Sequence, residues 1–463
     1  MNHTEKRAPK SLHEMSPVQL IVSSFFVIIV CGAVLLNLPI ASRGTQPVNY
    51  IDAIFTATSA TCVTGLTPFD TYSQWSAFGQ IVIMLLMQFG GLGIVTFTTG
   101  FTLFLRKKLG LRDMQIAKEY TSGSVLNLSR LIKTIIIYSL SCEFIGALVF
   151  MTRFVPQFGL ARGMWISIFT AISAYCNAGF DLMGFINPGT SFMDYAKDPL
   201  VSLTISFLVI LGGLGFVVVS DVYSCIAKKI ENIKNHPKLN LHSFIVIFMS
   251  LSLLAVGTLL FLFFEYDNTL ADFSFLEKLN VSFFQSAVAR TAGFFSVSIG
   301  EEKVLTKLLT IILMFIGASS ASTGGGIKTT TLVVILATLR SVVKGHDDTV
   351  ILKHKVEKST VYKAFSLTIL ALFLVSIVTA VISLVESRQD IAVLDVTFET
   401  VSAFSTAGLT TGITGMLSVV SKFLIMLMMF IGRVGPISFM FTVSLKKNKN
   451  SAKVLPSSKL IVG

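Results

Sequence analysis

Four short stretches of small residues, each ending in a glycine followed by Leu or Phe, recur along the 463-residue chain. They read Ser59-Ala60-Thr61-Cys62-Val63-Thr64-Gly65-Leu66, Ser173-Ala174-Tyr175-Cys176-Asn177-Ala178-Gly179-Phe180, Ser286-Ala287-Val288-Ala289-Arg290-Thr291-Ala292-Gly293-Phe294 and Ser402-Ala403-Phe404-Ser405-Thr406-Ala407-Gly408-Leu409. The third stretch is one residue longer than the others. The glycines stand 114, 114 and 115 residues apart, and this constant interval indicates four repeats of one unit.

Each glycine lies between two long apolar runs. The runs before the glycines are 18–38, 131–155, 244–264 and 361–385, and the runs after them are 81–105, 200–226, 308–339 and 423–445. Each run has about 20 residues or more, enough to cross a hydrocarbon core of about 30 Å. The dozen residues before each small-residue stretch are too few to span, so a short helix that enters the membrane and turns back fits best. The unit is therefore outer helix, re-entrant pore helix, small-residue segment and inner helix.

The composition requires a lipid environment for most of the chain. Hydrophobic residues make up 53% and charged residues only 13%, against about 25% charged in an ordinary globular protein, and the mean hydropathy is +0.76. Soluble multidomain enzymes, secreted disulfide scaffolds and disordered chains are thereby excluded. The net charge of +12 comes from Lys and Arg clusters between the apolar runs, which is the positive-inside pattern. It places both termini and three loops in the cytoplasm, and it does not indicate a nucleic-acid partner.

The predicted fold class is an all-α integral membrane protein, with four tandem helix–pore loop–helix repeats and eight spanning helices around one central pore. The predicted divisions are a cytoplasmic N-terminus at 1–16, pore repeats at 17–118, 119–235, 236–350 and 351–447, and a cytoplasmic C-terminal tail at 448–463. Membrane lipid is the expected surrounding partner.

The repeated glycines predict a cation filter. Backbone carbonyls that point into one pore need positive or alternating φ, which glycine accepts without steric cost, and rings of such carbonyls replace the hydration shell of a cation. The alternative, glycines that only permit close helix packing, explains one such position better than four in phase. The predicted filter residues are Thr61, Cys62, Val63, Thr64, Gly65, Tyr175, Cys176, Asn177, Ala178, Gly179, Arg290, Thr291, Ala292, Gly293, Ser405, Thr406, Ala407 and Gly408.

The four segments resemble the pore loops of the potassium transporter superfamily that includes the Trk, Ktr and plant HKT proteins, over essentially the whole chain. The stretches at 59–66 and 290–294, with Phe430-Ile431-Gly432-Arg433-Val434-Gly435-Pro436, are specific for it. The short N-terminus is similar to the membrane subunits of Ktr systems (KtrB and KtrD type). The resemblance implies potassium uptake across a bacterial plasma membrane and potassium bound at the filter carbonyls. It also implies a homodimer with one pore per subunit and a cytosolic nucleotide-binding subunit of the RCK type (KtrA- or KtrC-like).

Glycine at all four filter positions favours potassium over sodium within that superfamily. Sodium stays open as an activator, and no cofactor is expected to be bound by this chain itself. The alternatives are a symporter that couples potassium to sodium or protons and, from another class, a membrane enzyme. Coupling would need a second ion site, for which the sequence offers no chain of carboxylates, and Glu143 is almost the only carboxylate within a spanning run.

The inner helices carry a second repeated feature, a glycine cluster. In the third inner helix the cluster becomes a long small-residue segment at 317–331, where three successive glycines predict a break in the helix. A polar break at membrane depth must be buried or line water. The resemblance implies that it is a gate, with Arg433 placed against it, and a packed kink is the alternative. The predicted gate residues are Gly317, Ala318, Ser319, Ser320, Ala321, Ser322, Thr323, Gly324, Gly325, Gly326, Lys328 and Arg433.

Arg290 is a cation inside a cation filter, so it is expected to point behind the filter toward an acid. Glu399 is the first candidate for this filter-bracing pair and Asp52 the second. The sequence contains no motif that indicates metal, redox or phosphate-binding chemistry. The five cysteines form no C-x-x-C pair, no histidine pair has metal-site spacing, and the glycines at 324–326 do not match a phosphate-binding loop because Ile327 separates them from Lys328.

Overall fold

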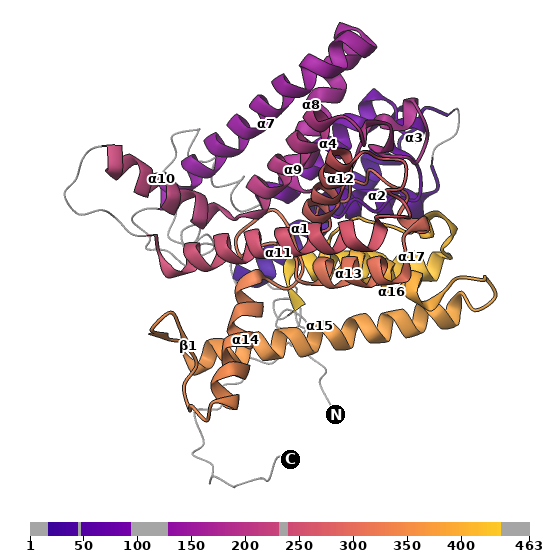
Figure 1. Cartoon of the computed structure of the whole chain (residues 1–463). Coiled ribbons are helices and arrows are strands. Elements are labelled where there is room, and N and C mark those ends of the chain that lie inside the picture. The colour runs from indigo at the N-terminus through magenta and orange to yellow at the C-terminus, as the bar shows by residue number, and fades with distance from the viewer. Residues whose placement is uncertain (1–16, 45–47, 94–127, 231–238, 437–463) are drawn as a thin grey trace, which may run out of the picture.

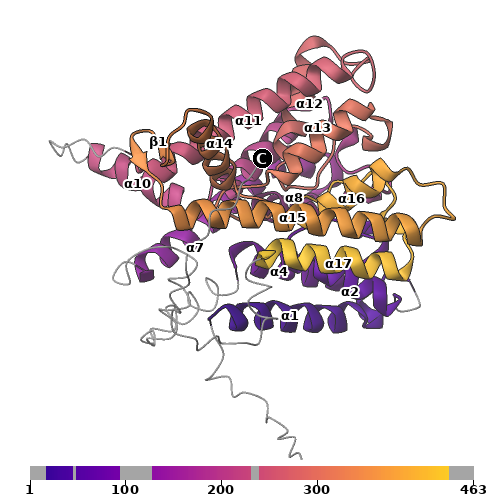
Figure 2. The ribbon, with the colours of Figure 1, turned by 90° about the horizontal axis from the view of Figure 1, so that it is seen from below.

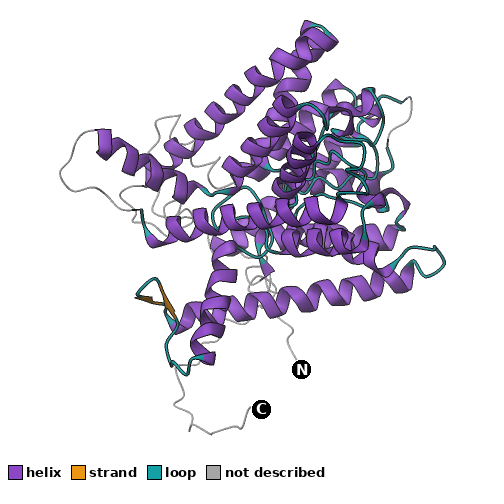
Figure 3. Cartoon of the chain, in the orientation of Figure 1, coloured by secondary structure: helices purple, strands orange, loops and turns teal. Residues whose placement is uncertain are grey.

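The computed structural model describes residues 17–44, 48–93, 128–230 and 239–436. The predicted terminal segments at 1–16 and 448–463, and the basic cluster at 106–118, lie outside the described residues. Within them the regular secondary structure is helical apart from one small hairpin, and loops connect the helices, as Figure 3 shows.

The elements are described by the predicted repeat in which they fall. The first repeat contains α1 (Pro17–Leu36), η2 (Pro39–Ala41), α2 (Tyr50–Cys62), α3 (Thr71–Gln74) and α4 (Ala77–Leu92). The second contains α7 (Leu128–Phe158), α8 (Leu160–Cys176), η4 (Met183–Phe185), η5 (Met193–Tyr195), α9 (Pro199–Gly213) and α10 (Phe216–Ile230). The third contains α11 (Leu241–Glu265), α12 (Phe275–Val288), η6 (Ile299–Glu301), α13 (Val304–Phe315) and α14 (Thr329–Val343). The antiparallel hairpin of β1 (Val350–Ile351) and β2 (His354–Lys355) leads to the fourth, with α15 (Lys358–Val385), α16 (Val393–Ser405), η7 (Thr414–Met416) and α17 (Val419–Val434).

The outer helix of every repeat is long and apolar enough to cross a membrane. These four helices are α1, α7, α11 and α15, and the bent pair of α9 and α10 makes a fifth span if it is counted as one. Figure 2 shows α15, α17 and α1 running roughly parallel, one below another. Within the described residues, length and composition therefore support four or five spans.

The pore helices are short, as predicted. α2, α8, α12 and α16 have 13, 17, 14 and 13 residues, too few to cross about 30 Å at 1.5 Å per residue. Their starts are capped locally: the Asn49 side chain accepts the Ile51 N–H in α2, and Ser274 with Glu277 forms a capping box in α12. The first turn of each pore helix is partly exposed and its C-terminal half is buried, so the core of the molecule surrounds the C-terminal halves of these four helices.

The inner helices differ from the prediction in one respect. We expected only the third to break, yet the second also breaks between α9 and α10, where the chain bends by 95° (Figure 1). Gly215 at the break has φ +90°, which favours glycine. The physical reason is tertiary: Phe216 donates its N–H to the carbonyl of Ala321 at 2.9 Å, so another segment satisfies the backbone that the break exposes.

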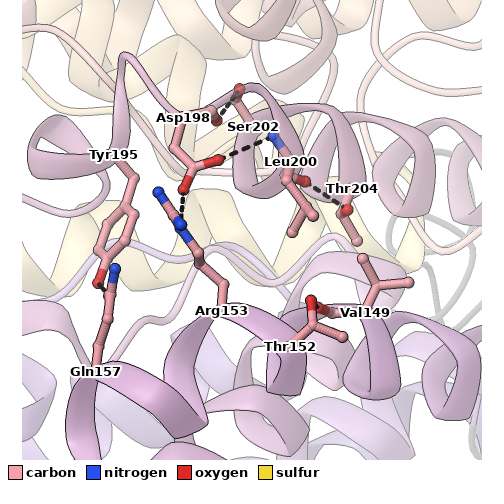
Figure 4. Close-up of polar contacts among 9 residues, drawn as sticks. All are labelled: Val149, Thr152, Arg153, Gln157, Tyr195, Asp198, Leu200, Ser202 and Thr204. Carbon is pink, nitrogen blue, oxygen red and sulfur yellow. Dashed lines mark hydrogen bonds and ion pairs between the residues drawn. The ribbon is translucent and has the colours of Figure 1, made fainter.

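Polar contacts at one end of the second repeat fix the outer helix against the inner helix. Figure 4 shows Arg153 of α7 bonded to Asp198 at 2.5 Å, while Asp198 caps α9 through the N–H of Leu200 at 3.0 Å. On the same side Tyr195 donates its hydroxyl to Gln157 of α7 at 2.6 Å. Helix N-cap bonds contribute about 1 kcal/mol, so these contacts orient α9 more than they stabilise the protein.

Candidate functional site

The structure brings the four repeated glycines together at one point. A Cβ added to Gly65 would lie 3.2 Å from the Cα of Gly179 and 3.3 Å from that of Gly408. A Cβ on Gly293 would lie 2.9 Å from the Cα of Gly179 and 3.3 Å from that of Gly408. All four have positive φ, between +71° and +96°. Residues more than 340 positions apart in sequence thus form one ring.

The order of contacts around this ring is cyclic. The Cβ position of Gly65 faces the carbonyl oxygen of Ala178 at 2.7 Å, and that of Gly179 faces the oxygen of Ala292 at 2.7 Å. The Cβ position of Gly293 faces the oxygen of Ala407 at 3.2 Å, and that of Gly408 faces the oxygen of Thr64. Each glycine therefore lies against the carbonyl of the residue before the next repeat's glycine, so four carbonyl oxygens lie around the ring. A Cβ at any of these glycines would come to 2.9 Å or less from the backbone of another repeat.

The ends of the pore helices deliver these carbonyls. The residue two positions before each glycine adopts the left-handed conformation in all four repeats: Val63, Asn177, Thr291 and Thr406, with φ between 51° and 75°. This conformation costs about 1–2 kcal/mol for each residue that has a Cβ. Backbone hydrogen bonds hold this conformation in place. In repeats one, two and four the residue before the glycine donates its N–H to the backbone carbonyl of Ser59, Ser173 and Ser402, each at 2.8 Å.

Polar contacts join each inner helix to the pore helix of the following repeat. The pairs are Gln80–Trp165 at 2.7 Å, Ser202–Asn280 at 2.7 Å, Lys307–Asp395 at 3.0 Å and Lys422–Asp52 at 2.8 Å. The last pair closes the circle from the fourth repeat to the first. The sequence analysis missed these contacts, although their signal was present: the pore-helix partner stands 13 or 14 residues before the glycine in every repeat.

The segment between α13 and α14, residues 316–328, lies against the residues two positions before the ring glycines; we call it the inner loop. Its Thr323 hydroxyl donates to Oδ1 of Asn177 at 3.1 Å. The inner loop is also bonded to the end of α9. Ser319 donates its N–H and its hydroxyl to the carbonyl of Gly213, at 3.2 and 2.5 Å, and Thr323 donates its N–H to the carbonyl of Gly212 at 3.3 Å. The inner loop thus supplies donors to the carbonyls that the broken helix leaves free.

Two cations stabilise the inner loop, one from α17 and one from within the loop. Arg433 of α17 donates to the carbonyl of Thr323 in the inner loop and to the carbonyls of Gly90 and Gly91 at the end of α4. Lys328 donates from Nζ to the carbonyls of Gly324 at 2.8 Å and Gly325 at 3.3 Å. The contact between Arg433 and the small-residue segment is the one that the resemblance implied.

The predicted filter-bracing pair is wrong. Arg290 contacts neither Glu399 nor Asp52; its guanidinium donates to the carbonyl of Ser250 at 3.3 Å and to the hydroxyl of Ser250 at 3.2 Å. Glu399 accepts the hydroxyl of Thr414, and Asp52 is paired with Lys422. Arg290 belongs to the third stretch, which is one residue longer than the others, and its guanidinium turns toward α11, the outer helix of its own repeat.

A cavity of about 340 Å³ opens on the other side of the ring and is lined by all four glycines. Two acids, Asp70 and Asp181, lie on its wall and were not singled out from the sequence. The pKa of Asp181 is raised to about 6 by burial, and the nearby charge of Asp70 adds to the shift. A cation that approaches the ring from this side meets negative charge first.

Other candidate chemistry finds little support in the described part of the chain. There, no group of three or more His, Cys, Asp or Glu side chains could hold a metal ion. Glu143, the one carboxylate considered for an enzyme, accepts both of its hydrogen bonds from Nε2 of Gln88, at 3.0 and 3.1 Å. It braces α7 against α4.

The ring, the short helices that lead to it and the apolar outer helices indicate a membrane protein of the cation-transport class. A family model described as cation transport protein (TrkH) matches residues 3–453. The chain belongs to this TrkH family.

Several named proteins are similar to the chain over nearly their whole length. It is 40% identical to the Ktr system potassium uptake protein B of Bacillus subtilis (strain 168) over 441 residues, covering 94% of each chain. It is 36% identical to the potassium/sodium uptake protein NtpJ of Enterococcus hirae, covering both chains completely. The crystal structure of the potassium transporter TrkH from Vibrio parahaemolyticus has the same fold, with a TM-score of 0.73 and 16% identity, covering 95% of this chain and 87% of that one.

Proposed function

We propose that this chain is the ion-conducting membrane subunit of a potassium uptake system. The observation that carries the proposal is the cyclic ring of four glycines, with the preceding carbonyl oxygens gathered around it. Neutral carbonyl oxygens arranged in this way replace the hydration shell of a monovalent cation. The name of the 40% identical relative, a potassium uptake protein, supports potassium as the ion.

The inner loop is proposed as the gate of this pathway. It lies against the filter segments through Thr323 and is held there by Arg433. Two positive charges, those of Arg433 and Lys328, contact backbone carbonyls of the loop when it is in place, and positive charge there opposes a cation on the same path. Opening then requires the loop to leave the ring and its bonds to α9.

The proposed topology has eight spans and both termini in the cytoplasm. The four outer helices supply four spans, and we propose that the inner segment of each repeat supplies one more. A broken helix is tolerated at this depth where protein or a water-filled cavity satisfies the backbone. We further propose a homodimer in the plasma membrane and a cytosolic nucleotide-binding subunit, because the relatives' names describe one protein of a Ktr system.

Rubidium uptake tests the proposal. The chain is produced, with a cytosolic partner of the Ktr type, in cells that lack their own potassium uptake, and growth at low potassium and uptake of ⁸⁶Rb⁺ are measured. We expect both to be restored. Correctly inserted protein without growth or uptake would refute a potassium-conducting role.

Sodium-coupled or sodium-activated transport is the second candidate, favoured by the relative named a potassium/sodium uptake protein. The same ⁸⁶Rb⁺ uptake, measured with and without sodium, distinguishes the two. Uptake that moves sodium in a fixed ratio to rubidium indicates coupling, whereas a sodium-stimulated rate without sodium flux indicates activation.

A further inference from the structure

The outer cavity, as we call the cavity of about 340 Å³ lined by the four ring glycines, carries two carboxylates on its wall, those of Asp70 and Asp181. Asp70 accepts the N–H of Ser73 at 2.8 Å and that of Gly189 at 3.3 Å. Asp181 accepts the N–H of Met183 at 3.0 Å. A carboxylate has about four acceptor positions, so both side chains keep positions that are open to a further ligand.

The two carboxylates are neighbours because one loop, residues 181–191, bonds to both. Asp181 bonds to Met183, and the next residue, Gly184, lies so close to Asp70 that an added Cβ would collide with both oxygens of its carboxylate. The charge of Asp70 therefore contributes, after burial, to the raised pKa of Asp181. Neighbouring carboxylates repel each other, and a cation bound between them removes that repulsion.

The protein supplies no counter-charge to this pair. Among the described residues neither acid belongs to an ion pair, and none of those that line the outer cavity is Lys or Arg. Ser191, at the end of the same loop, also lines the cavity and is 4% exposed; its Oγ lies beside Asp181 without a hydrogen bond of good geometry to any described residue. Two unpaired acids and a buried oxygen without a partner thus point to a ligand.

The chemistry of these groups selects a divalent cation. Ca²⁺ and Mg²⁺ prefer hard oxygen ligands with negative charge, and carbonyls or waters fill the positions that carboxylates leave. The carbonyl ring, by contrast, is neutral and suits potassium. Because no group of three His, Cys, Asp or Glu side chains that could hold a metal ion gathers in the described part of the chain, a bound ion keeps several waters. Its affinity then falls in the weak range of extracellular calcium sites, about 10⁻⁴–10⁻³ M.

We propose that Asp70, Asp181 and Ser191 form a binding site for a divalent cation such as Ca²⁺ in the outer cavity, and that the bound ion slows the entry of potassium. The slowing rests on the proposed function, whereas the binding does not. A divalent ion on the cavity wall repels a monovalent cation that approaches the ring. It also cancels the attraction that the two carboxylates otherwise exert on that cation.

Titration with Mn²⁺, followed by electron paramagnetic resonance, tests the binding directly. The full chain is purified into nanodiscs of phosphatidylcholine, which has no net charge to attract the metal. We expect one site per chain with a dissociation constant of about 10⁻⁴–10⁻³ M, from which Ca²⁺ displaces Mn²⁺ and an equal concentration of K⁺ does not. The double variant Asp70→Asn and Asp181→Asn removes both charges and keeps an oxygen that accepts the loop N–H groups. Its constant is expected to be at least about tenfold weaker.

Uptake of ⁸⁶Rb⁺ into right-side-out vesicles tests the effect on entry. External Ca²⁺ is varied at constant ionic strength, and inhibition is expressed relative to each variant's own uptake without Ca²⁺. We expect half-inhibition of the wild type near the binding constant, and a value at least about tenfold higher in the double variant. Asp194→Asn is the matched control, because Asp194 is an exposed acid that bonds to Asn187 and does not line the outer cavity. Both of its constants are expected to equal those of the wild type.

The outcomes separate the site from its consequence. Absence of saturable Mn²⁺ binding in the wild type, equal displacement by K⁺, or an unchanged constant in the double variant would each overturn the site. A change in Asp194→Asn as large as that in the double variant would indicate general surface charge and would overturn it as well. Binding without inhibition of uptake would overturn the role in entry. Wild-type protein that binds Mn²⁺ but shows no uptake would refute the proposed function and would still support the site.

Discussion

Arg433 is the residue whose removal tests the gate most directly. Of the three carbonyls that its guanidinium contacts, one belongs to the inner loop (Thr323) and two to the end of α4 (Gly90 and Gly91). The contacts to α4 hold the guanidinium in place, and the contact to Thr323 ties the loop to it. Replacing Arg433 by Met keeps a long apolar side chain and removes every donor.

The expected size of the effect follows from that one bond. A hydrogen bond from a charged group contributes about 1.5–3 kcal/mol, so its loss shifts the equilibrium between closed and open loop by about ten- to 150-fold toward open. We expect ⁸⁶Rb⁺ flux without the cytosolic partner to rise toward that factor, until the open state predominates. Arg433→Lys keeps the charge but has no fork of donors to reach both segments, so an intermediate flux is expected.

The assay is ⁸⁶Rb⁺ flux per inserted protein in membrane vesicles, measured with and without the cytosolic partner. Arg388→Met is the matched control, because Arg388 is an exposed cation just beyond the end of α15. A Met variant at position 433 that inserts normally but shows flux at or below the wild type would refute the argument that this contact holds the gate closed.

Three further predictions concern the filter, the polar contacts between neighbouring repeats and the cavity lined by the four glycines. Gly65→Ser places a Cβ 2.7 Å from the carbonyl oxygen of Ala178, so competition assays should show weaker discrimination of potassium against sodium; unchanged ion preference would contradict the carbonyl ring. The side chains of Asp52 and Lys422 are 10% and 12% exposed, so neutralising either one leaves the other charge largely buried and should lower the free energy of unfolding by about 3–5 kcal/mol. Thermal unfolding in detergent should show that the double variant loses less stability than the two single variants together, and strict additivity would rule out the pair. Because the pKa of Asp181 is about 6, the carboxylate is lost as the pH falls through 6; uptake at low potassium should drop there, and Asp181→Asn should give a low, pH-independent rate.

Part of this site followed from local sequence and part did not. Placement of the four glycines in one ring was predictable, because a constant interval and a shared helix-ending pattern impose the same local geometry four times. The partner of Arg290 was not predictable. One extra residue in the third stretch changes the direction of that side chain, and only the position of α11 shows that Ser250, rather than an acid, receives it.

The sequence by itself determined the membrane environment, the repeat unit, the short pore helices and the break before α14, because hydropathy, length and glycine content act within a few turns of chain. Only the tertiary structure decided that α9 also breaks and that the inner loop completes its backbone bonds. Glycine clusters occur in all the inner helices and permit either a tight packing contact or a break. The choice depends on whether donors from another segment reach the freed carbonyls, and here Ser319 and Thr323, about 110 residues further along the chain, supply them.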